Sequence, residues 1–386
     1  MRILVLDTIH GGAELARALR GSGYQVDEVD VYRGKAGIPV EEALVRSYDL
    51  VTAPVHLDPD HPLLQQHGPA VSHHETVGRV IRGRRTPHPF IEITGARGKT
   101  TTAHALASLL PGPGILHTST GTYRYPEQER LWKRSITPAS LIPAAHEAWR
   151  IGGWLIAEES LGVTGAGDVA VLTSPDDYPI AAGKKHAITE KCRLLSRARI
   201  MVLPPGIDLP GRAVAADEIV SLDGPVCRYA WDGIAGAFTN PLFTLEGYRT
   251  ALVLAAATAC VLGVDPAPLA GFAALPGRMA TWWEGDRLIV DNANSGTNVD
   301  TTIEAARYAR TLRGEGPLTL VIGEEARAIC EGFSPEDIAR AISSIGPTAT
   351  VYVGEGHEAA TLDAGLDLAR EITPAGSIVL AVKTWR

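Results

Sequence analysis

"PFIEITGARGKTTTAHALASLL", residues 89–110, is the stretch that decides the fold of this chain. The apolar run at its start predicts a buried strand, and its second half predicts a helix that ends at the "PGPG" of residues 111–114. The glycine loop between them is suited to hold phosphate with backbone N–H groups and a helix N-terminus. The usual pattern, G-x-x-x-x-G-K-[ST], would have its first glycine at Ile93, so this loop is two residues shorter.

Two side chains of the loop complete the expected phosphate chemistry. Lys99 supplies a mobile positive charge for the outer phosphates, and Thr100 supplies a hydroxyl for Mg²⁺. A plain glycine turn is the alternative, but the strand before the loop and the helix after it are the context that the motif requires. The predicted nucleotide-binding residues are Thr94, Gly95, Ala96, Arg97, Gly98, Lys99, Thr100 and Thr101.

Composition excludes several other classes of protein. The chain has 386 residues, of which 45% are hydrophobic and 21% charged, as expected for a soluble protein of two or three domains. A net charge of -8 disfavours binding to nucleic acid or a membrane surface, and no apolar run is long enough to span a bilayer. The start reads as a strand and turn, not as a signal peptide. Four dispersed cysteines, without a CxxC pair, predict reduced thiols in a cytoplasm: Cys192, Cys227, Cys260 and Cys330.

Strands and helices alternate along most of the chain. This alternation predicts an α/β protein with parallel sheets that are covered on both faces. Residues 52–89 differ, because they are rich in proline and histidine, and we place a domain boundary at their end. A second boundary is expected near residue 276. The predicted domains are 1–88, 89–275 and 276–386.

The short loop with its threonine run resembles the Mur ligase superfamily. Those ATP-dependent ligases carry "TGxxGKTT", and residues 94–101 read "TGARGKTT". The resemblance implies an N-terminal substrate-binding domain, a central P-loop ATPase domain and a C-terminal Rossmann-like domain. It also implies ATP and Mg²⁺ as cofactors.

The same resemblance implies roles for further residues. "AEESLG" (157–162) implies that Glu158 helps to hold Mg²⁺, the alternative being that Glu158 or Glu159 is a solvated acid at a strand end. "KKHAITEKCRLL" (184–195) implies that Lys191 is carbamylated by CO₂, although an ordinary surface lysine is nearly as well supported. In the C-terminal domain, three residues correspond to positions near the nucleotide: Arg278 of "PGRM" at the phosphates, Asp291 of "IVDNANSGTNVDTT" at the ribose, and Lys383 near the site.

Two segments depart from the superfamily pattern. A histidine that often serves as a further metal ligand is replaced here by Asp176, Asp177 and Tyr178 of "TSPDDYP". Gly247 and Thr250 stand where the asparagines that contact adenine are usual. Asn240 is a candidate to replace those asparagines.

The N-terminal segments "ILVLDTIHGG", "VDVYRG" and "APVHLDPDHPLL" resemble one branch, the Mur-like coenzyme F-430 synthetases of methanogens. That resemblance implies that ATP activates a propionate-derived carboxylate of a nickel seco-tetrapyrrole, and that a carbon nucleophile of the same molecule then closes a carbocyclic ring. The first alternative is an amide-forming Mur-like ligase. The second, of another class, is a P-loop switch or metal chaperone, which has no need of a C-terminal domain that reaches the nucleotide.

Histidine and arginine are concentrated near the N-terminus. Seven of the twelve histidines lie in the first 90 residues, and Arg79, Arg82, Arg84 and Arg85 follow closely. A polycarboxylated tetrapyrrole needs such donors, but a hydrophilic linker would have the same composition. In an extended segment His73 and His74 could not both face one ligand, and the spacing of the histidines does not support axial ligation of nickel. The predicted substrate residues are His10, His56, His73, Arg79 and Arg82.

Overall fold

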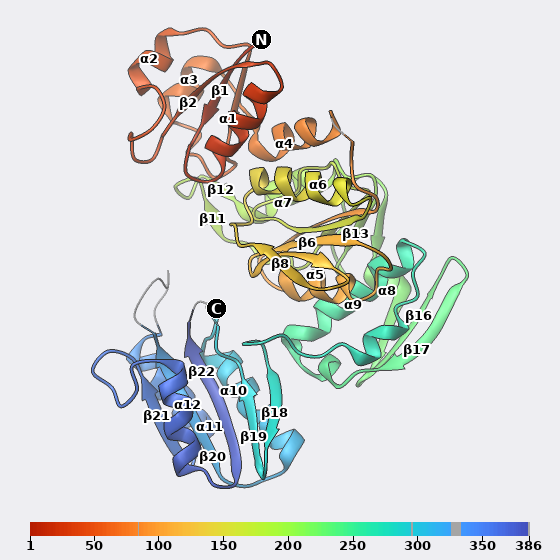
Figure 1. The fold of residues 1–386 in the computed structure, drawn as a ribbon, viewed down its shortest axis with the longest axis vertical. Coiled ribbons are helices and arrows are strands. Elements are labelled where there is room, and N and C mark those ends of the chain that lie inside the picture. The colour runs from red at the N-terminus through yellow and green to blue at the C-terminus, as the bar shows by residue number, and fades with distance from the viewer. Residues whose placement is uncertain (84, 295, 326–332, 385–386) are drawn as a thin grey trace. The chain divides into compact units, whose positions relative to one another are not determined.

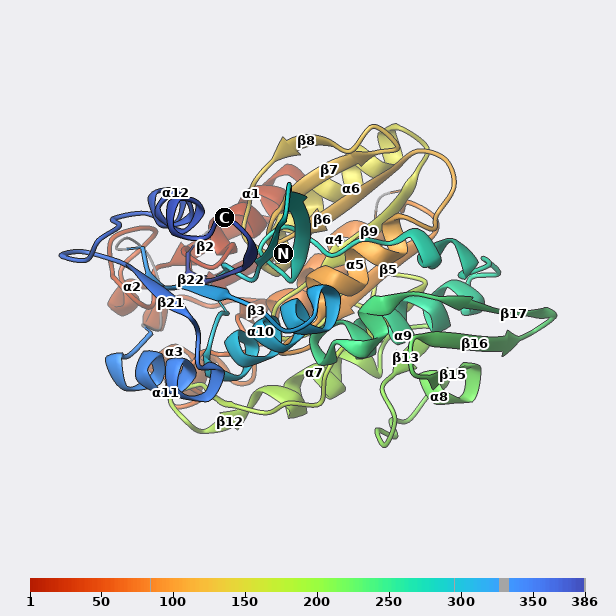
Figure 2. The same cartoon turned by 90° about the horizontal axis from the view of Figure 1, so that it is seen from below.

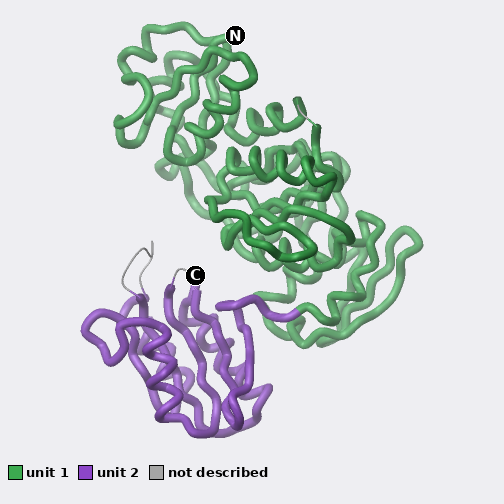
Figure 3. The backbone as a smooth tube through the Cα atoms, in the orientation of Figure 1, with its two compact units in different colours: residues 1–272 green, residues 273–386 purple. Residues whose placement is uncertain are grey.

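The computed structural model describes residues 1–386 except 84, 295, 326–332 and 385–386. The chain divides into two compact units, residues 1–272 and 273–386 (Figure 3). Among the described residues, no helix is both long and apolar enough to cross a membrane. Cys192, Cys227 and Cys260 are free thiols, whereas Cys330 lies outside the described residues.

The first unit begins with a four-stranded parallel sheet in the order β2-β1-β3-β4 (Figure 1). Its strands are β1 (Arg2–Leu6), β2 (Gln25–Val29), β3 (Leu50–Ala53) and β4 (Val71–Ser72). Its helices are α1 (Gly12–Gly21), α2 (Val40–Val45), α3 (Pro62–His67) and α4 (His73–Arg82). The helix α4 corrects the extended segment considered for His73 and His74: Ser72 and Glu75 form a capping box that starts a helix there.

An eight-stranded sheet follows in the same unit, in the order β14-β13-β10-β5-β9-β6-β7-β8. Its strands are β5 (Phe90–Thr94), β6 (Gly114–Thr118), β7 (Gly121–Tyr125), β8 (Glu129–Trp132), β9 (Trp154–Glu158), β10 (Val169–Leu172), β13 (Met201–Leu203) and β14 (Ala213–Ala215). The strands from β14 to β6 are parallel, whereas β7 and β8 extend the sheet in antiparallel fashion, a feature that the alternation of elements did not predict.

Helices cover the eight-stranded sheet, with α6 on one side and α5 and α9 on the other (Figures 1 and 2). The principal helices are α5 (Lys99–Ala107), α6 (Leu141–Arg150), α7 (Ala187–Leu195) and α9 (Glu246–Val261). The shorter elements are β11 (Pro179–Ile180), β12 (Lys185–His186), α8 (Ala216–Ile219), and the 3₁₀ helices Pro138–Ser140, Pro241–Thr244 and Ala267–Gly271. A separate antiparallel sheet consists of β15 (Val220–Asp223), β16 (Val226–Trp231) and β17 (Ile234–Thr239), where no strand was predicted.

One hydrophobic core connects the two sheets of the first unit. It joins Ile3 and Val5 of β1 and Val77 of α4 to Phe90 of β5 and Leu155 of β9. Burial of this apolar surface makes the small N-terminal sheet part of the same compact unit as the central sheet. The predicted boundary at residue 88 therefore separates two sheets that share a core.

The second unit is a five-stranded sheet in the order β18-β19-β22-β20-β21, parallel except for β18. Its strands are β18 (Ala280–Glu284), β19 (Arg287–Asp291), β20 (Leu318–Glu324), β21 (Ala349–Val353) and β22 (Gly376–Lys383), and its helices are α10 (Val299–Arg313), α11 (Pro335–Ile345) and α12 (Leu362–Ile372). Ser334 caps α11, with Pro335 in its first turn, because its hydroxyl accepts from the Asp337 N–H. The multi-domain α/β architecture is the predicted one.

Candidate functional site

The glycine loop connects β5 to α5, as the sequence predicts. Gly95 has φ +149°, and a Cβ there would overlap the Thr173 hydroxyl, which itself donates to the Arg97 carbonyl at 2.6 Å. Gly98 has φ +83° and lies immediately before α5. Both positions require glycine, since the backbone enters the left-handed region and one of them touches a neighbouring strand end.

Lys99, Thr100 and Glu158 lie together at this loop. The Lys99 ammonium donates to the carbonyls of Gly95 at 3.0 Å and Ala96 at 3.4 Å, and lies 3.9 Å from the Glu158 carboxylate. Thr100 Oγ1 donates to Glu158 Oε2 at 2.9 Å. The adjacent hydroxyl and carboxylate are hard oxygen donors of the kind that Mg²⁺ prefers, so these residues fit the implied ion.

Two serines at this site were missed by the sequence reasoning. The Ser119 N–H donates to Glu158 Oε2 at 3.1 Å, and the Ser119 hydroxyl lies 3.3 Å from Thr100 Oγ1. Ser174 Oγ accepts from the N–H groups of Ala96 at 3.0 Å and Arg97 at 3.2 Å. Both serines follow strands that neighbour β5 or β9, and a serine at a strand end carries little signal in a single sequence.

Thr94 and Arg97 of the loop have structural partners. The Thr94 hydroxyl donates to the Glu159 carbonyl at 3.2 Å, and Thr101 is buried. The Arg97 guanidinium lies 2.9 Å from the Asp176 carboxylate, but both side chains are exposed. Such an exposed ion pair contributes little to stability.

The two adjacent acids at the end of β9 have different surroundings. Glu158 lies at the loop, whereas Glu159 is fully buried. Burial, together with the negative charge of Glu92, raises the pKa of Glu159 well above its usual value. Glu159 is therefore an acid of the protein interior whose charged form is disfavoured, and its burial excludes the solvated strand-end acid for this residue.

Lys191 is a buried lysine on α7, not a surface residue. Its Nζ has no hydrogen-bond partner among the described residues, and it lies 4.8 Å from the centre of the Tyr178 ring. Burial, and then the positive charge of Lys99, lowers the pKa of Lys191 to about 8. Roughly a tenth of its amine is therefore unprotonated at pH 7. Asp176 and Asp177 carry the nearby negative charges that oppose this shift.

A cavity of about 300 Å³ lies in the first unit; we call it the histidine pocket. It is lined by His10, Pro54, Val55, His56, His73, His74, Thr137, Pro138, Ser160 and Leu161. The structure thus brings together His10, His56 and His73, three predicted substrate residues that are up to 63 positions apart in the chain. His74 and the segment 137–138 were not predicted.

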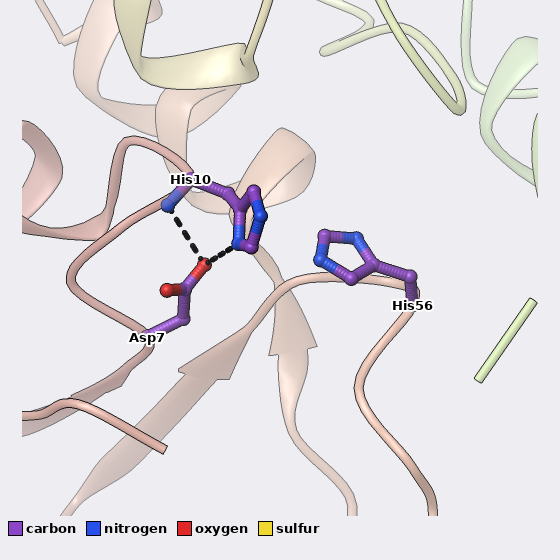
Figure 4. Close-up of side chains that lie close together, drawn as sticks. All are labelled: Asp7, His10 and His56. Atoms are coloured by element: carbon purple, nitrogen blue, oxygen red, sulfur yellow. Dashed lines mark hydrogen bonds and ion pairs between the residues drawn. The ribbon is translucent and has the colours of Figure 1, made fainter. Parts of the chain in front are cut away.

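His10 and His56 both line this pocket, and their rings lie beside each other (Figure 4). His10 Nδ1 lies 2.9 Å from Oδ2 of Asp7, a fully buried carboxylate, and the rings of His10 and His56 pack edge to face with centroids 4.8 Å apart. The Tyr32 ring stacks on His56 at 5.9 Å. Burial, more than the positive charge of His10, lowers the pKa of His56.

His73 and His74 are at the N-terminus of α4, and both are almost fully buried. Burial lowers the pKa of His73 to about 3 and that of His74 to about 4, so both are neutral at pH 7. His74 Nε2 donates to the Ser160 carbonyl at 2.8 Å. A helical backbone lets both imidazoles line one cavity.

The predicted arginines are not among the residues that line the histidine pocket. Arg79 and Arg82 are exposed in the last turns of α4, and Arg82 donates to the Gly165 carbonyl at 2.6 Å. The Arg85 guanidinium lies 5.6 Å from the centre of the Trp149 ring, and Arg84 lies outside the described residues. Their role with a substrate stays a prediction.

In the second unit, the Arg278 turn and Asp291 are brought together. Asp291 accepts from the Gly277 N–H through Oδ2 and from the Ala293 N–H through Oδ1, both at 3.0 Å. The carboxylate therefore holds the turn that carries Arg278. Lys383 is buried at the end of β22, with its Nζ 5.9 Å from the centre of the Phe333 ring. Contact of these residues with a nucleotide stays a prediction.

Asn240 is not a good replacement for the adenine-contacting asparagines. It is buried in the first unit, where its amide donates to the carbonyls of Leu269 at 2.7 Å and Phe272 at 2.9 Å, and its carbonyl accepts from Leu242. Both of its amide hydrogens are thus used to hold the chain just before the second unit. Gly247 and Thr250, in the first turns of α9, are exposed.

Solved ligase structures share this fold. The chain is similar to the UDP-N-acetylmuramoyl-L-alanyl-D-glutamate–2,6-diaminopimelate ligase structure, with a TM-score of 0.52, 17% identity, and coverage of 99% of this chain and 86% of that chain. It is also similar to the MurF ligase of Thermotoga maritima, solved in complex with ADP, with a TM-score of 0.51, 15% identity, and coverage of 90% and 87%. These likenesses show that the chain has the fold of the Mur ligases.

Sequence similarity identifies the branch. The chain is 30% identical to coenzyme F(430) synthetase of Methanosarcina acetivorans, in an alignment that covers 100% of this chain and 99% of the relative. Residues 283–384 match the family model of the coenzyme F430 synthetase CfbE C-terminal domain. The chain belongs to the coenzyme F(430) synthetase family.

Proposed function

We propose that this protein uses ATP to activate a carboxylate of a nickel seco-tetrapyrrole and then closes a carbocyclic ring in the same molecule to form coenzyme F-430. The observation that carries the proposal is the grouping of Lys99, Thr100 and Glu158 at a Mur-type loop. Membership of the coenzyme F(430) synthetase family supplies the class of substrate.

In the first step, a carboxylate oxygen of the substrate attacks the γ-phosphorus in line, and the bond to the β-phosphate oxygen breaks to release ADP. Lys99 and loop N–H groups stabilise the charge on the transferred phosphoryl group. Thr100 and Glu158 are the residues that would hold Mg²⁺, which neutralises phosphate charge when it is bound. The product is an acyl phosphate, which has a far better leaving group than the carboxylate.

In the second step, a carbon of the same macrocycle loses a proton and attacks the acyl carbon, and inorganic phosphate leaves. The macrocycle loses one water overall, while ATP becomes ADP and phosphate. Because both reacting groups belong to one molecule, orientation supplies a large part of the rate.

The family resemblance implies a carbamate on Lys191, and the surroundings of this residue support the assignment. CO₂ adds to an unprotonated amine, which then loses a proton and becomes an anionic carbamate. A buried Lys191 amine with a pKa of about 8 is suited to this reaction, and its Nζ has no hydrogen-bond partner among the described residues. Intact-protein mass measurement with and without bicarbonate, on wild type and Lys191→Met, tests the assignment. An equal mass for wild type under both conditions, with activity independent of bicarbonate, would contradict it.

Product analysis tests the proposed function. Purified protein receives Mg-ATP and the nickel seco-tetrapyrrole in amine-free buffer, and ADP, product mass and visible spectrum are followed. We expect one ADP per macrocycle, loss of one water, and a changed spectrum, since ring closure alters the geometry of the chromophore.

The same measurement separates the alternatives. A product that forms only after ammonia or an amino acid is added would establish the amide-forming ligase. Hydrolysis of ATP at an equal rate without any carboxylate substrate would establish a P-loop switch instead.

A further inference from the structure

The histidine pocket contains an arrangement of nitrogen donors that the phosphate chemistry does not use. Potential ligand atoms of Asp7, His10 and His56 all lie within 4.8 Å of one another (Figure 4). Metal–nitrogen distances of roughly 2 Å place ligands on opposite sides of one ion about 4 Å apart. Only a small closing movement therefore separates this cluster from a metal-binding geometry.

Asp7 fixes the orientation of His10. Its carboxylate accepts from the Ile9 N–H at 2.7 Å and from the His10 N–H at 3.1 Å, and it faces His10 Nδ1 at 2.9 Å. Because an ionised carboxylate only accepts, Nδ1 carries the hydrogen and Nε2 keeps its lone pair. This carboxylate–histidine pairing is the usual support of a metal-ligating imidazole.

The backbone around Asp7 holds this residue in an unusual conformation. Asp7 has φ +83°, which is unusual for a residue other than glycine, and a Cβ on Gly12 would overlap the Asp7 carbonyl oxygen. A fully buried carboxylate in a strained conformation is a feature concentrated at functional sites.

His73 and His74 supply an independent observation in the same cavity. Each is 2% exposed, and among the described residues His73 Nε2 and His74 Nδ1 have no hydrogen-bond partner. His74 donates to the Ser160 carbonyl through Nε2, so its Nδ1 is an unpaired lone pair. An unpaired buried nitrogen is unfavourable unless a ligand or water satisfies it.

His117 shows how a buried histidine with a structural role differs. It is fully buried, but its Nδ1 lies 2.8 Å from Thr122 Oγ1 and its Nε2 lies 3.0 Å from Ser140 Oγ. Both nitrogens of His117 are satisfied by the protein, whereas one nitrogen each of His73 and His74 is not.

We propose that the histidine pocket binds a late divalent transition-metal ion such as nickel, with His10 and His56 as nitrogen ligands and Asp7 as the residue that positions His10. Imidazole nitrogens suit such ions. The ion can arrive free, or already held by the ring nitrogens of a tetrapyrrole, in which case an imidazole takes an axial position. Arrival of the ion inside a tetrapyrrole rests on the proposed function.

The first arm of the test uses the full chain, stripped of metal by a chelator, and NiCl₂ alone. Calorimetry measures affinity for Ni²⁺, and the visible spectrum of Co²⁺ reports nitrogen ligation. We expect His10→Ala, His56→Ala and Asp7→Asn each to weaken binding roughly 10–100-fold. His88→Ala is the matched control, because His88 also pairs with a carboxylate, Asp168 at 2.9 Å, but does not line the pocket. Thermal unfolding identifies variants that fail to fold. If Asp7→Asn fails to fold, the result is decided by His10→Ala and His56→Ala.

The second arm adds the nickel seco-tetrapyrrole without ATP and follows its visible spectrum. A spectral change that is lost in His10→Ala or His56→Ala, but kept in His88→Ala, shows that these histidines bind nickel held inside the macrocycle. Histidine-dependent binding of NiCl₂ alone assigns the site to a free ion; either result supports the proposal. Binding in both arms that is unchanged in the double variant His10→Ala/His56→Ala overturns it, as does no binding in either. Product formation without a histidine-dependent nickel signal would leave the proposed function intact and remove only this site.

Discussion

The phosphate loop and the histidine pocket belong to the same unit but are built in opposite ways. The loop is contiguous, residues 94–101, and its geometry comes from glycines and a helix start. The pocket takes side chains from segments that extend from His10 to Leu161. A backbone site is thus encoded locally, whereas a side-chain site exists only after distant segments pack together.

Replacing the loop lysine should produce the largest effect and leave the pocket untouched. Lys99→Ala should lower the rate of ADP formation roughly 10²–10³-fold, because it removes positive charge from the transferred phosphoryl group. Nickel affinity and the unfolding temperature should stay near wild type, since Lys99 bonds loop carbonyls and lies beside Glu158 at the loop, away from the residues that line the histidine pocket. Lys35→Ala, at an exposed lysine, is the control. Wild-type rates in Lys99→Ala would remove the phosphate-loop assignment.

The two adjacent acids at the end of β9 provide a sharper comparison, because their surroundings differ. Glu158→Gln should raise the Mg²⁺ concentration for half-maximal activity roughly 10–100-fold, because it removes the carboxylate that lies against Thr100. Glu159→Gln should leave that concentration unchanged, since Glu159 lies in the interior, where burial raises its pKa and disfavours its charged form. Steady-state kinetics at varied Mg²⁺ measures both. Equal effects of the two substitutions would contradict the separation of their roles.

Stability measurements can separate two costs of adding a side chain at Gly95. One is the close approach to Thr173, and the other is the unfavourable backbone conformation. Gly95→Ala should destabilise the protein by roughly 1–3 kcal/mol, since the methyl group meets the Thr173 hydroxyl. Gly23→Ala is the matched substitution: it has φ +87° but open space around it, so only the conformational cost of about 1 kcal/mol remains. Denaturant unfolding gives both values. A Gly95→Ala cost no larger than that of Gly23→Ala would show that Thr173 does not restrict the loop.

Lys191 should give the free energy of unfolding a dependence on pH. Its pKa is lowered to about 8 in the folded protein, from a usual 10.5. The unfolded chain then binds more protons than the folded one between those values, so the free energy of unfolding should rise with pH from about 8 to 10.5. Lys191→Met should remove this increase without changing nickel affinity. If the increase persists in Lys191→Met, another group is responsible for it.

The sequence by itself determined the phosphate loop and the α/β architecture around it. A strand, two glycines that need special φ values, and a lysine and threonine at a helix start are neighbours in the chain, so local rules identify them. Alternating strands and helices likewise predicted the parallel sheets, but not the antiparallel β7, β8 and β15–β17, because polar residues or glycine interrupt these strands and leave no continuous apolar run.

Tertiary structure alone decided the environments of the side chains. Glu158 and Glu159 are adjacent in the chain, yet successive residues at a strand end point in opposite directions, so one meets Thr100 and the other is buried with Glu92. Whether Lys191 was a surface residue depended on the burial of α7. His10 and His56 are 46 positions apart and meet only because β1 and β3 pair in parallel, which brings the loops after them to the same edge of the sheet.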